Sequence, residues 1–148
     1  MVGTNTKTNT LEVRRTIQAP VEKVYRAWTE PEQISQWFGC DKVARARVTQ
    51  ELKVGGQYRI EANCADGSPG LVYGTFKEII PNQKLVYSWT NGSAEYPASD
   101  TIVSVEFIAR GSETEIHLVH SNFALAKSVE GHTMGWQECL EKLARFVA

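Results

Sequence analysis

The chain has 148 residues, of which 42% are hydrophobic, a size and composition typical of one compact domain with a single core. Its 16 basic and 17 acidic side chains are interspersed, which excludes the basic surface block typical of proteins that bind nucleic acid or an anionic membrane. The three cysteines are far apart and lack metal-site spacing, which favours reduced thiols in a cytoplasmic protein over a disulfide framework.

The first residues differ in composition from the rest of the chain. Residues 1–9 are rich in Thr and Asn and contain no apolar run, so we interpret them as a flexible tail and not as a secretory signal or membrane anchor. Residues 10–148 then form a single domain. We expect a cytoplasmic protein that binds neither nucleic acid nor a membrane, and the sequence leaves a monomer and a weak dimer equally open.

The predicted domain begins with a strand and two short helices. Residues 11–17 alternate apolar and polar side chains with the period of a strand. Pro20 and Pro31 each suit the first turn of a helix, and apolar residues follow both at helical spacing. This pattern predicts helices over residues 21–29 and 31–38.

Six more strands are predicted, joined mainly by short turns. Period-two alternation and turn residues such as Gly55 and Gly56 mark them, and Gly74 indicates a bulge or a close backbone approach. No strand-helix-strand repeat follows the first strand, so the sheet should be mainly antiparallel. The expected ranges are residues 42–51, 57–64, 71–80, 85–89, 101–109 and 113–121.

One long amphipathic helix is predicted from about residue 129 to the end. Trp136, Leu140, Leu143 and Val147 recur at spacings of four, three and four, which places them on one helix face. Gly135 costs helix stability and therefore indicates close packing or space for a guest molecule. The predicted fold class is α+β, with a curved, mainly antiparallel seven-stranded sheet wrapped around this C-terminal helix.

Several short motifs occur in a fixed order from about residue 11 to the end. They are Arg15-x-Ile17-x-Ala19-Pro20-x-x-x-Val24-x-x-Ala27-Trp28-Thr29-x-Pro31, Trp37-Phe38-Gly39, Gly55-Gly56-x-Tyr58, Gly74, Leu85-Val86-Tyr87-Ser88-Trp89, Thr114-Glu115-Ile116-His117-Leu118 with His120, and Gly135-Trp136. Together they resemble the activator of heat-shock-protein-90 ATPase homologue-like family, within the START and birch-pollen-allergen-like (SRPBCC) superfamily. The resemblance implies a helix-grip fold with a cavity between sheet and C-terminal helix, gated by the short helices. It also implies a hydrophobic or aromatic ligand, such as a lipid or polyketide, although some superfamily members are enzymes.

The candidate ligand-binding residues are mainly apolar and aromatic side chains of the predicted inner sheet face and the long helix. They are Trp37, Tyr58, Ile60, Tyr87, Trp89, Val103, Val105, Ile116, Leu118, His120, His132, Trp136 and Leu140. A mostly apolar lining with a few polar groups is typical of small-molecule sites. Each of these apolar residues agrees equally well with a place in the packed core, since burial of its side chain stabilises the folded protein by about 1.5–3 kcal/mol without any ligand. Trp37, with Trp28 and Phe38, either lines the cavity entrance or anchors the short helices.

The two candidate histidines each have two interpretations. Strand alternation places His120 on the covered face, where a neutral imidazole could orient a ligand or act as acid or base. Alternatively it is simply hydrogen-bonded, as buried polar groups normally are. His132 lies near the start of the long helix and faces either the cavity mouth or solvent.

The sequence contains no recognisable catalytic constellation. It lacks a Gly-x-Ser-x-Gly nucleophile elbow, a phosphate-binding loop and a set of zinc ligands, so we assign no catalytic residue, metal or cofactor. The predicted function is binding of a small hydrophobic or aromatic, lipid- or polyketide-like molecule. Two alternatives stay open: a protein-interaction module that modulates a chaperone ATPase, with the chaperone as partner, and a cofactor-free cyclase- or hydrolase-like enzyme.

Overall fold

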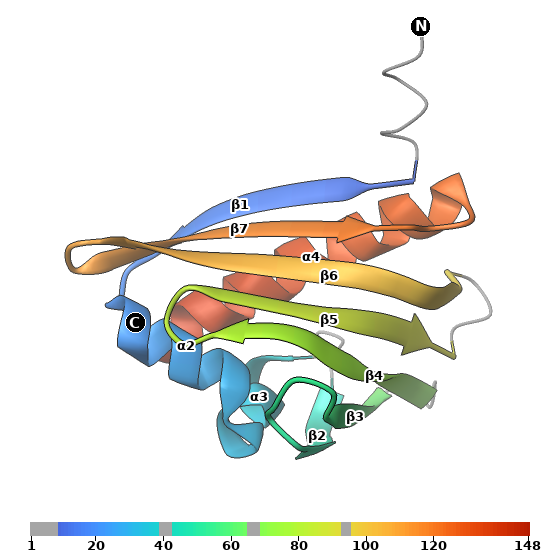
Figure 1. Cartoon of the computed structure of the whole chain (residues 1–148), viewed down its shortest axis with the longest axis horizontal. Helices are drawn as coiled ribbons and strands as arrows, with labels where there is room; N and C mark the ends of the chain where they lie inside the picture. Colours follow the sequence, from blue (N-terminus) through green and yellow to red (C-terminus); the bar gives the residue numbers. More distant parts are fainter. Residues whose placement is uncertain (1–8, 39–42, 65–68, 93–95) are drawn as a thin grey trace, which may run out of the picture.

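The computed structural model describes residues 9–38, 43–64, 69–92 and 96–148 of the chain (Figure 1). Of the tail expected over residues 1–9, only Asn9 is among the described residues. Cys40 also lies outside the described residues. The described part contains seven strands and three helices. None of these helices is long and apolar enough to cross a membrane.

Two short helices follow the first strand, β1 (Leu11–Ile17), and form a corner at one end of the sheet (Figure 1). They are α2 (Val21–Thr29) and α3 (Pro31–Trp37). Pro20 precedes α2 in an extended conformation, and Pro31 occupies the first turn of α3, where its missing N–H interrupts no helical hydrogen bond. Both predicted helices are confirmed.

All seven strands belong to one antiparallel sheet. After β1 the strands are β2 (Val43–Gln50), β3 (Gln57–Cys64), β4 (Pro69–Ile80), β5 (Lys84–Asn91), β6 (Ala98–Arg110) and β7 (Glu113–Ser121). Their order across the sheet is β1-β7-β6-β5-β4-β3-β2, so consecutive strands from β2 to β7 are neighbours. The first strand joins at the far edge, where Leu11 lies opposite His120.

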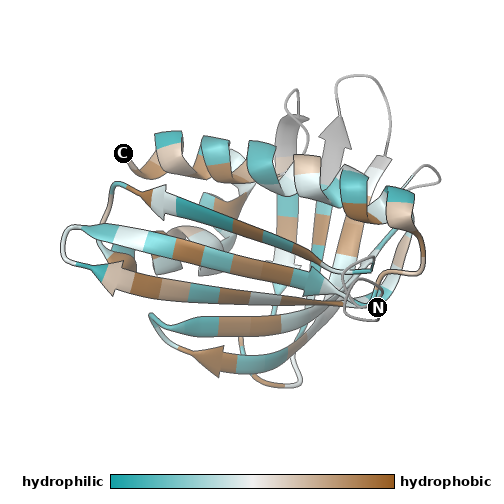
Figure 2. Ribbon diagram, turned by 90° about the horizontal axis from the view of Figure 1, so that it is seen from above, coloured by the Kyte–Doolittle hydropathy of each residue, from teal (hydrophilic) through white to brown (hydrophobic). Residues whose placement is uncertain are grey.

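The long helix α4 (Ala126–Val147) lies along one face of the curved sheet (Figures 1 and 2). The predicted stripe is the buried one, since Trp136, Leu140, Leu143 and Val147 are all nearly inaccessible to solvent. The helix begins three residues before the predicted start near residue 129. The predicted α+β helix-grip architecture is therefore confirmed.

The hairpin of β5 and β6 is longer than predicted. Asn91 pairs with Ala98, and the backbone N–H of Asp100 donates to the Thr90 hydroxyl over 2.9 Å. The strands predicted over residues 85–89 and 101–109 left out the segment between them, which is polar in composition and includes Pro97. Main-chain pairing across a hairpin does not require apolar side chains, so composition missed the start of β6.

Gly74 permits a close approach of β4 to β5. A Cβ atom at this position would lie only 2.0 Å from the backbone oxygen of Ser88, so only glycine fits. The phenol of Tyr58 donates a 2.6 Å hydrogen bond to the same oxygen. The close approach expected at Gly74 is confirmed, and the register shift of β4 falls between Phe76 and Glu78.

The inner face of the sheet supplies the dry core. Val103 and Val105 of β6 are fully buried, as are Ile116 and Leu118 of β7, and Leu140 of α4 is 1% exposed. On the opposite face, charged side chains form ion pairs. They include Glu115 with Arg14 and Arg110, and beside them the His117 ring is hydrogen-bonded to Glu12 and Glu106. Alternation along the strands thus separates a packed face from a solvated one.

The contribution of α4 to the core can be measured by truncating one buried side chain. Leu143→Ala removes a fully buried side chain and should lower the free energy of unfolding by about 2–5 kcal/mol. Phe146→Ala, on the same helix but 39% exposed, should cost about 1 kcal/mol or less. Urea unfolding of both variants gives the values. Equal losses would contradict the assignment of Leu143 to the core.

Candidate functional site

Two adjoining pockets lie on the α4 side of the sheet. The larger has a volume of about 420 Å³ and the smaller about 30 Å³. The larger falls within the range of small-molecule pockets, roughly 300–1,000 Å³, whereas the smaller has room for little more than a water molecule. Phe38, Ile60 and Trp89 contribute to the walls of both. The larger pocket, hereafter the cavity, is therefore the candidate site.

Strands β3 to β5 form one side of the cavity and α4 forms another, with Phe38 and Tyr96 completing the lining. Most of the lining side chains are apolar or aromatic, or are glycines that contribute only backbone. The full lining is Phe38, Ile60, Gly70, Val72, Trp89, Asn91, Tyr96, Gly131, His132, Met134, Gly135, Trp136, Glu138 and Cys139. This composition matches that of general small-molecule sites.

Two glycines one turn apart on α4 shape the cavity in different ways. A Cβ added to Gly135 would meet no heavy atom within 4 Å, so this position borders open space. A Cβ added to Gly131 would lie 2.5 Å from the ring of Tyr96, so the tyrosine packs directly on the helix backbone there. Gly135 is exposed and borders the cavity, so close packing, one of the two interpretations offered for it, does not apply.

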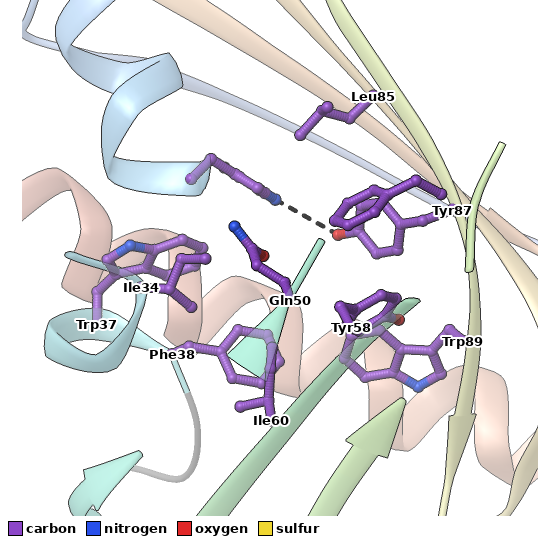
Figure 3. A pocket seen from close by; sticks show the side chains of 11 residues that line it. Ile34, Trp37, Phe38, Gln50, Tyr58, Ile60, Leu85, Tyr87 and Trp89 are labelled. Atoms are coloured by element: carbon purple, nitrogen blue, oxygen red, sulfur yellow. Dashed lines mark hydrogen bonds between the residues drawn. The ribbon is translucent and has the colours of Figure 1, made fainter. Parts of the chain in front are cut away.

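The smaller pocket lies where the short helices meet the sheet (Figure 3). Figure 3 shows Trp37 and Phe38 on one side of it and Tyr58, Tyr87 and Trp89 of the strands on the other. The Trp37 indole donates to the Ala27 carbonyl over 2.8 Å, and its side chain is 1% exposed. Trp37 thus holds α2 and α3 together at this packed junction.

Trp28 links α2 to both the sheet and α4. Its indole N–H donates to the Tyr87 hydroxyl over 3.4 Å, the bond drawn in Figure 3. Its ring stacks on Trp136 with a centroid distance of 6.1 Å. Burial raises the pKa of Tyr87 and of Tyr58 above the usual tyrosine value, so both phenols stay protonated. Neither tyrosine can therefore supply a phenolate base at neutral pH.

His120 is a fully buried histidine with both ring nitrogens occupied. The Thr101 hydroxyl donates to the Trp89 carbonyl over 2.7 Å, so its oxygen accepts the proton of His120 Nε2, also over 2.7 Å. The Trp136 indole donates to Nδ1 over 3.1 Å. Burial, and secondarily the nearby His132, hold the pKa of His120 well below its usual value. The ring is neutral, its two nitrogens bond Thr101 and Trp136 within the core, and it lines neither pocket.

His132 is buried too, but it lines the cavity. Its Nδ1 donates to the Ser128 carbonyl over 2.8 Å, which leaves Nε2 as an acceptor. Asn91 Nδ2 lies 2.8 Å from Nε2, and the Trp89 indole donates to it over 3.3 Å. Burial lowers the pKa of His132, and the Ser128 carbonyl partly opposes this effect. The solvated helix end offered as one interpretation of His132 is not what the structure shows.

The structure brings together only part of the predicted site. Ile60, Trp89, His132 and Trp136 line the cavity. Trp37, Tyr58 and Tyr87 line the smaller pocket. The remaining candidates line neither pocket, because they lie inside the dry core or, for His120, inside a closed hydrogen-bond network. They are Val103, Val105, Ile116, Leu118, His120 and Leu140, and of the two interpretations offered for the apolar ones, their burial agrees with core packing.

Sequence reasoning missed several residues of the cavity, chiefly Asn91, Tyr96 and Cys139. Cys139 was not among the candidate residues, and Asn91 and Tyr96 fell between the strands predicted over residues 85–89 and 101–109. The one usable signal was the spacing of Gly131 and Gly135, which removes two side chains from the same face of α4. Among the described residues, no group of three or more His, Cys, Asp or Glu side chains gathers to hold a metal ion.

The two buried histidines should make the stability depend on pH. Both pKa values lie below the usual value of about 6.5, so below that pH the unfolded chain binds protons that the folded protein excludes. Stability is complete above about pH 6.5 and falls toward lower pH, by up to about 1.4 kcal/mol per unit for His120. Urea unfolding between about pH 7 and 5.5 measures the slope, and His132→Gln should reduce it. A stability that does not change over this interval would contradict the assignment.

Solved structures of other proteins share this fold. A protein from Chromobacterium violaceum is 26% identical, with a TM-score of 0.81 over 94% of this chain and 96% of its own. An AHSA1-like protein from Aeromonas hydrophila is 21% identical, with a TM-score of 0.75 over 93% and 91%. DynU16, a protein in the dynemicin biosynthetic locus, is 21% identical, with a TM-score of 0.74 over 93% of this chain and 46% of its own. Comparison with curated proteins found no match.

The motifs noted in the sequence agree with a family model. The model described as activator of Hsp90 ATPase homolog 1-like protein matches residues 18–148. That range contains every described helix and all strands except β1. The chain therefore belongs to the activator of Hsp90 ATPase homolog 1-like family.

Proposed function

We propose that this protein binds a small hydrophobic or aromatic molecule in the cavity between the sheet and α4. The observation that carries the proposal is the cavity itself, which occupies about 420 Å³ beside Trp89, Trp136 and the open face of Gly135. The cavity is open to solvent on one side, where Met134 is 62% exposed, and an apolar ligand that covers its walls gains roughly 25 cal/mol per Å² of apolar area removed from water. Aromatic walls favour a ligand with rings of its own.

The polar groups near the cavity favour binding over catalysis. Both nitrogens of His120 are occupied by Thr101 and Trp136, and the buried tyrosines keep their protons. Neither His120 nor these tyrosines can therefore act as an acid or base on a bound molecule, and His132 is the imidazole that lines the cavity. DynU16, which shares the fold, belongs to a biosynthetic locus, and this supports including aromatic natural products among the ligands tested.

Modulation of a chaperone ATPase is the second candidate function, and the family description favours it. It would require a surface that contacts the chaperone instead of an internal cavity. Steady-state ATPase turnover of the chaperone, measured with saturating amounts of this protein, distinguishes the two. An unchanged turnover would remove this candidate and leave ligand binding untouched.

A ligand screen combined with a cavity-filling variant tests the proposal. Lipids, flavonoids and polyketide-like aromatics are compared by thermal shift and by NMR titration. At least one compound should raise the melting temperature and shift the indole signals of Trp89 and Trp136. Gly135→Leu should abolish these shifts, because its side chain would enter the open space beside the helix.

Gln137→Leu is the matched control for this experiment. It adds the same side chain to α4 at an exposed position outside the cavity lining, so it should retain binding. Melting temperatures of both variants without ligand show that each is folded. Absence of saturable binding across all compound classes, or unchanged binding in Gly135→Leu, would overturn the proposal.

A further inference from the structure

The polar groups of the cavity gather around His132, while the rest of the lining is largely apolar. Asn91 lies beside His132, with 2.8 Å between Asn91 Nδ2 and His132 Nε2. None of the lining residues that the structure describes is a lysine or an arginine, and Glu138 is the one charged side chain among them. The lining thus offers hydrogen bonds to a ligand but no positive charge.

The hydrogen-bonding direction of this pair follows from its surroundings. His132 Nδ1 gives its proton to the Ser128 carbonyl, so Nε2 can only accept while the ring is neutral. The backbone N–H of Ala98 donates to Asn91 Oδ1 over 3.3 Å, and Asn91 Nδ2 donates one proton to the Tyr96 carbonyl over 3.3 Å, which leaves its other proton for the histidine. The donor and the acceptor are bonded to each other at the edge of the cavity, so a ligand reaches both only when Asn91 Nδ2 and His132 Nε2 move apart.

We infer that the cavity selects uncharged ligands carrying a hydroxyl group, which inserts between Asn91 Nδ2 and His132 Nε2. A hydroxyl accepts from the amide and donates to the imidazole at the same time, so one protein hydrogen bond is replaced by two. The hydrophobic body of the ligand then lies against Trp89 and Trp136. This inference rests on the proposed binding function and adds the chemical class of the ligand.

The same geometry discriminates against two related classes of molecule. A carboxylate only accepts hydrogen bonds, so it cannot satisfy His132 Nε2, and the lining provides no cation to offset its buried charge. An ether or ketone can accept from Asn91, yet it leaves Nε2 with only the 3.3 Å bond from the Trp89 indole. Phenols and alcohols should therefore bind better than fatty acids or ethers of equal size.

Three naphthalene derivatives with the same ring system test this class assignment. They are 2-naphthol, 2-methoxynaphthalene and 2-naphthoate, titrated into the full chain at neutral pH by calorimetry and NMR. The naphthol should bind about tenfold more tightly than the methyl ether, the equivalent of one additional hydrogen bond. The naphthoate should bind most weakly of the three.

His132→Phe separates hydrogen bonding from packing. It keeps a flat ring but removes the acceptor nitrogen. Naphthol and methoxynaphthalene should then bind the variant with about equal affinity, and the affinity of the ether should not change. If this variant does not fold, the affinities of the three naphthalene derivatives for the wild-type protein still test the inference. The Trp89 indole signal adds a second readout, because its partner Nε2 gains a new donor only from the naphthol.

The outcomes distinguish failure of this inference from failure of the proposed function. Naphthoate or methoxynaphthalene binding as tightly as naphthol would overturn the inference and leave ligand binding intact. Binding of another compound class with none of these three would do the same. No binding of any compound would overturn both.

Discussion

The packing of Trp136 against the sheet is the contact on which the rest of the structure depends. Its ring centroid lies 5.1 Å from that of Trp89 in β5 and 6.1 Å from that of Trp28 in α2. Its indole N–H also donates to His120 in β7. One side chain therefore joins α4, a short helix and two strands, and its burial fixes how far the helix stands from the sheet. Aromatic contacts of this kind add to the energy of area burial.

Trp136 also marks the boundary between two halves of α4. Toward the C-terminus, Leu140, Leu143 and Val147 meet the sheet without a gap. Toward the N-terminus, the helix presents Gly131 and Gly135, and the cavity opens beside them. The two histidines near this boundary are neutral and carry their protons on opposite nitrogens, Nε2 in His120 and Nδ1 in His132. The first is closed within the core, whereas the second directs its acceptor nitrogen toward Asn91 at the cavity.

The sequence predicted the scaffold well because periodicity reports which side of an element is buried. Alternation assigned the inner faces of the strands, and the spacing from Trp136 to Val147 assigned the buried face of α4. Periodicity does not report whether a buried side chain lies within the packed core or beside a pocket. Val105 and Leu118 could therefore not be distinguished from Ile60, although of these three only Ile60 borders the pockets. Whether space remains depends on how side chains from distant elements fit together. Asn91 escaped prediction because main-chain pairing with Ala98 places it, and Tyr96 because it lies outside the strands and packs its ring on Gly131.

The central claim is that the space beside Gly135 and Trp136 is a real apolar cavity and not a packed core. Xenon enters apolar cavities without requiring any particular chemistry from them, so it tests the space independently of ligand identity. A crystal of the protein pressurised with xenon should show a bound atom between Trp89, Trp136 and Gly135. Xenon absent from this position, with side chains filling it instead, would contradict the account.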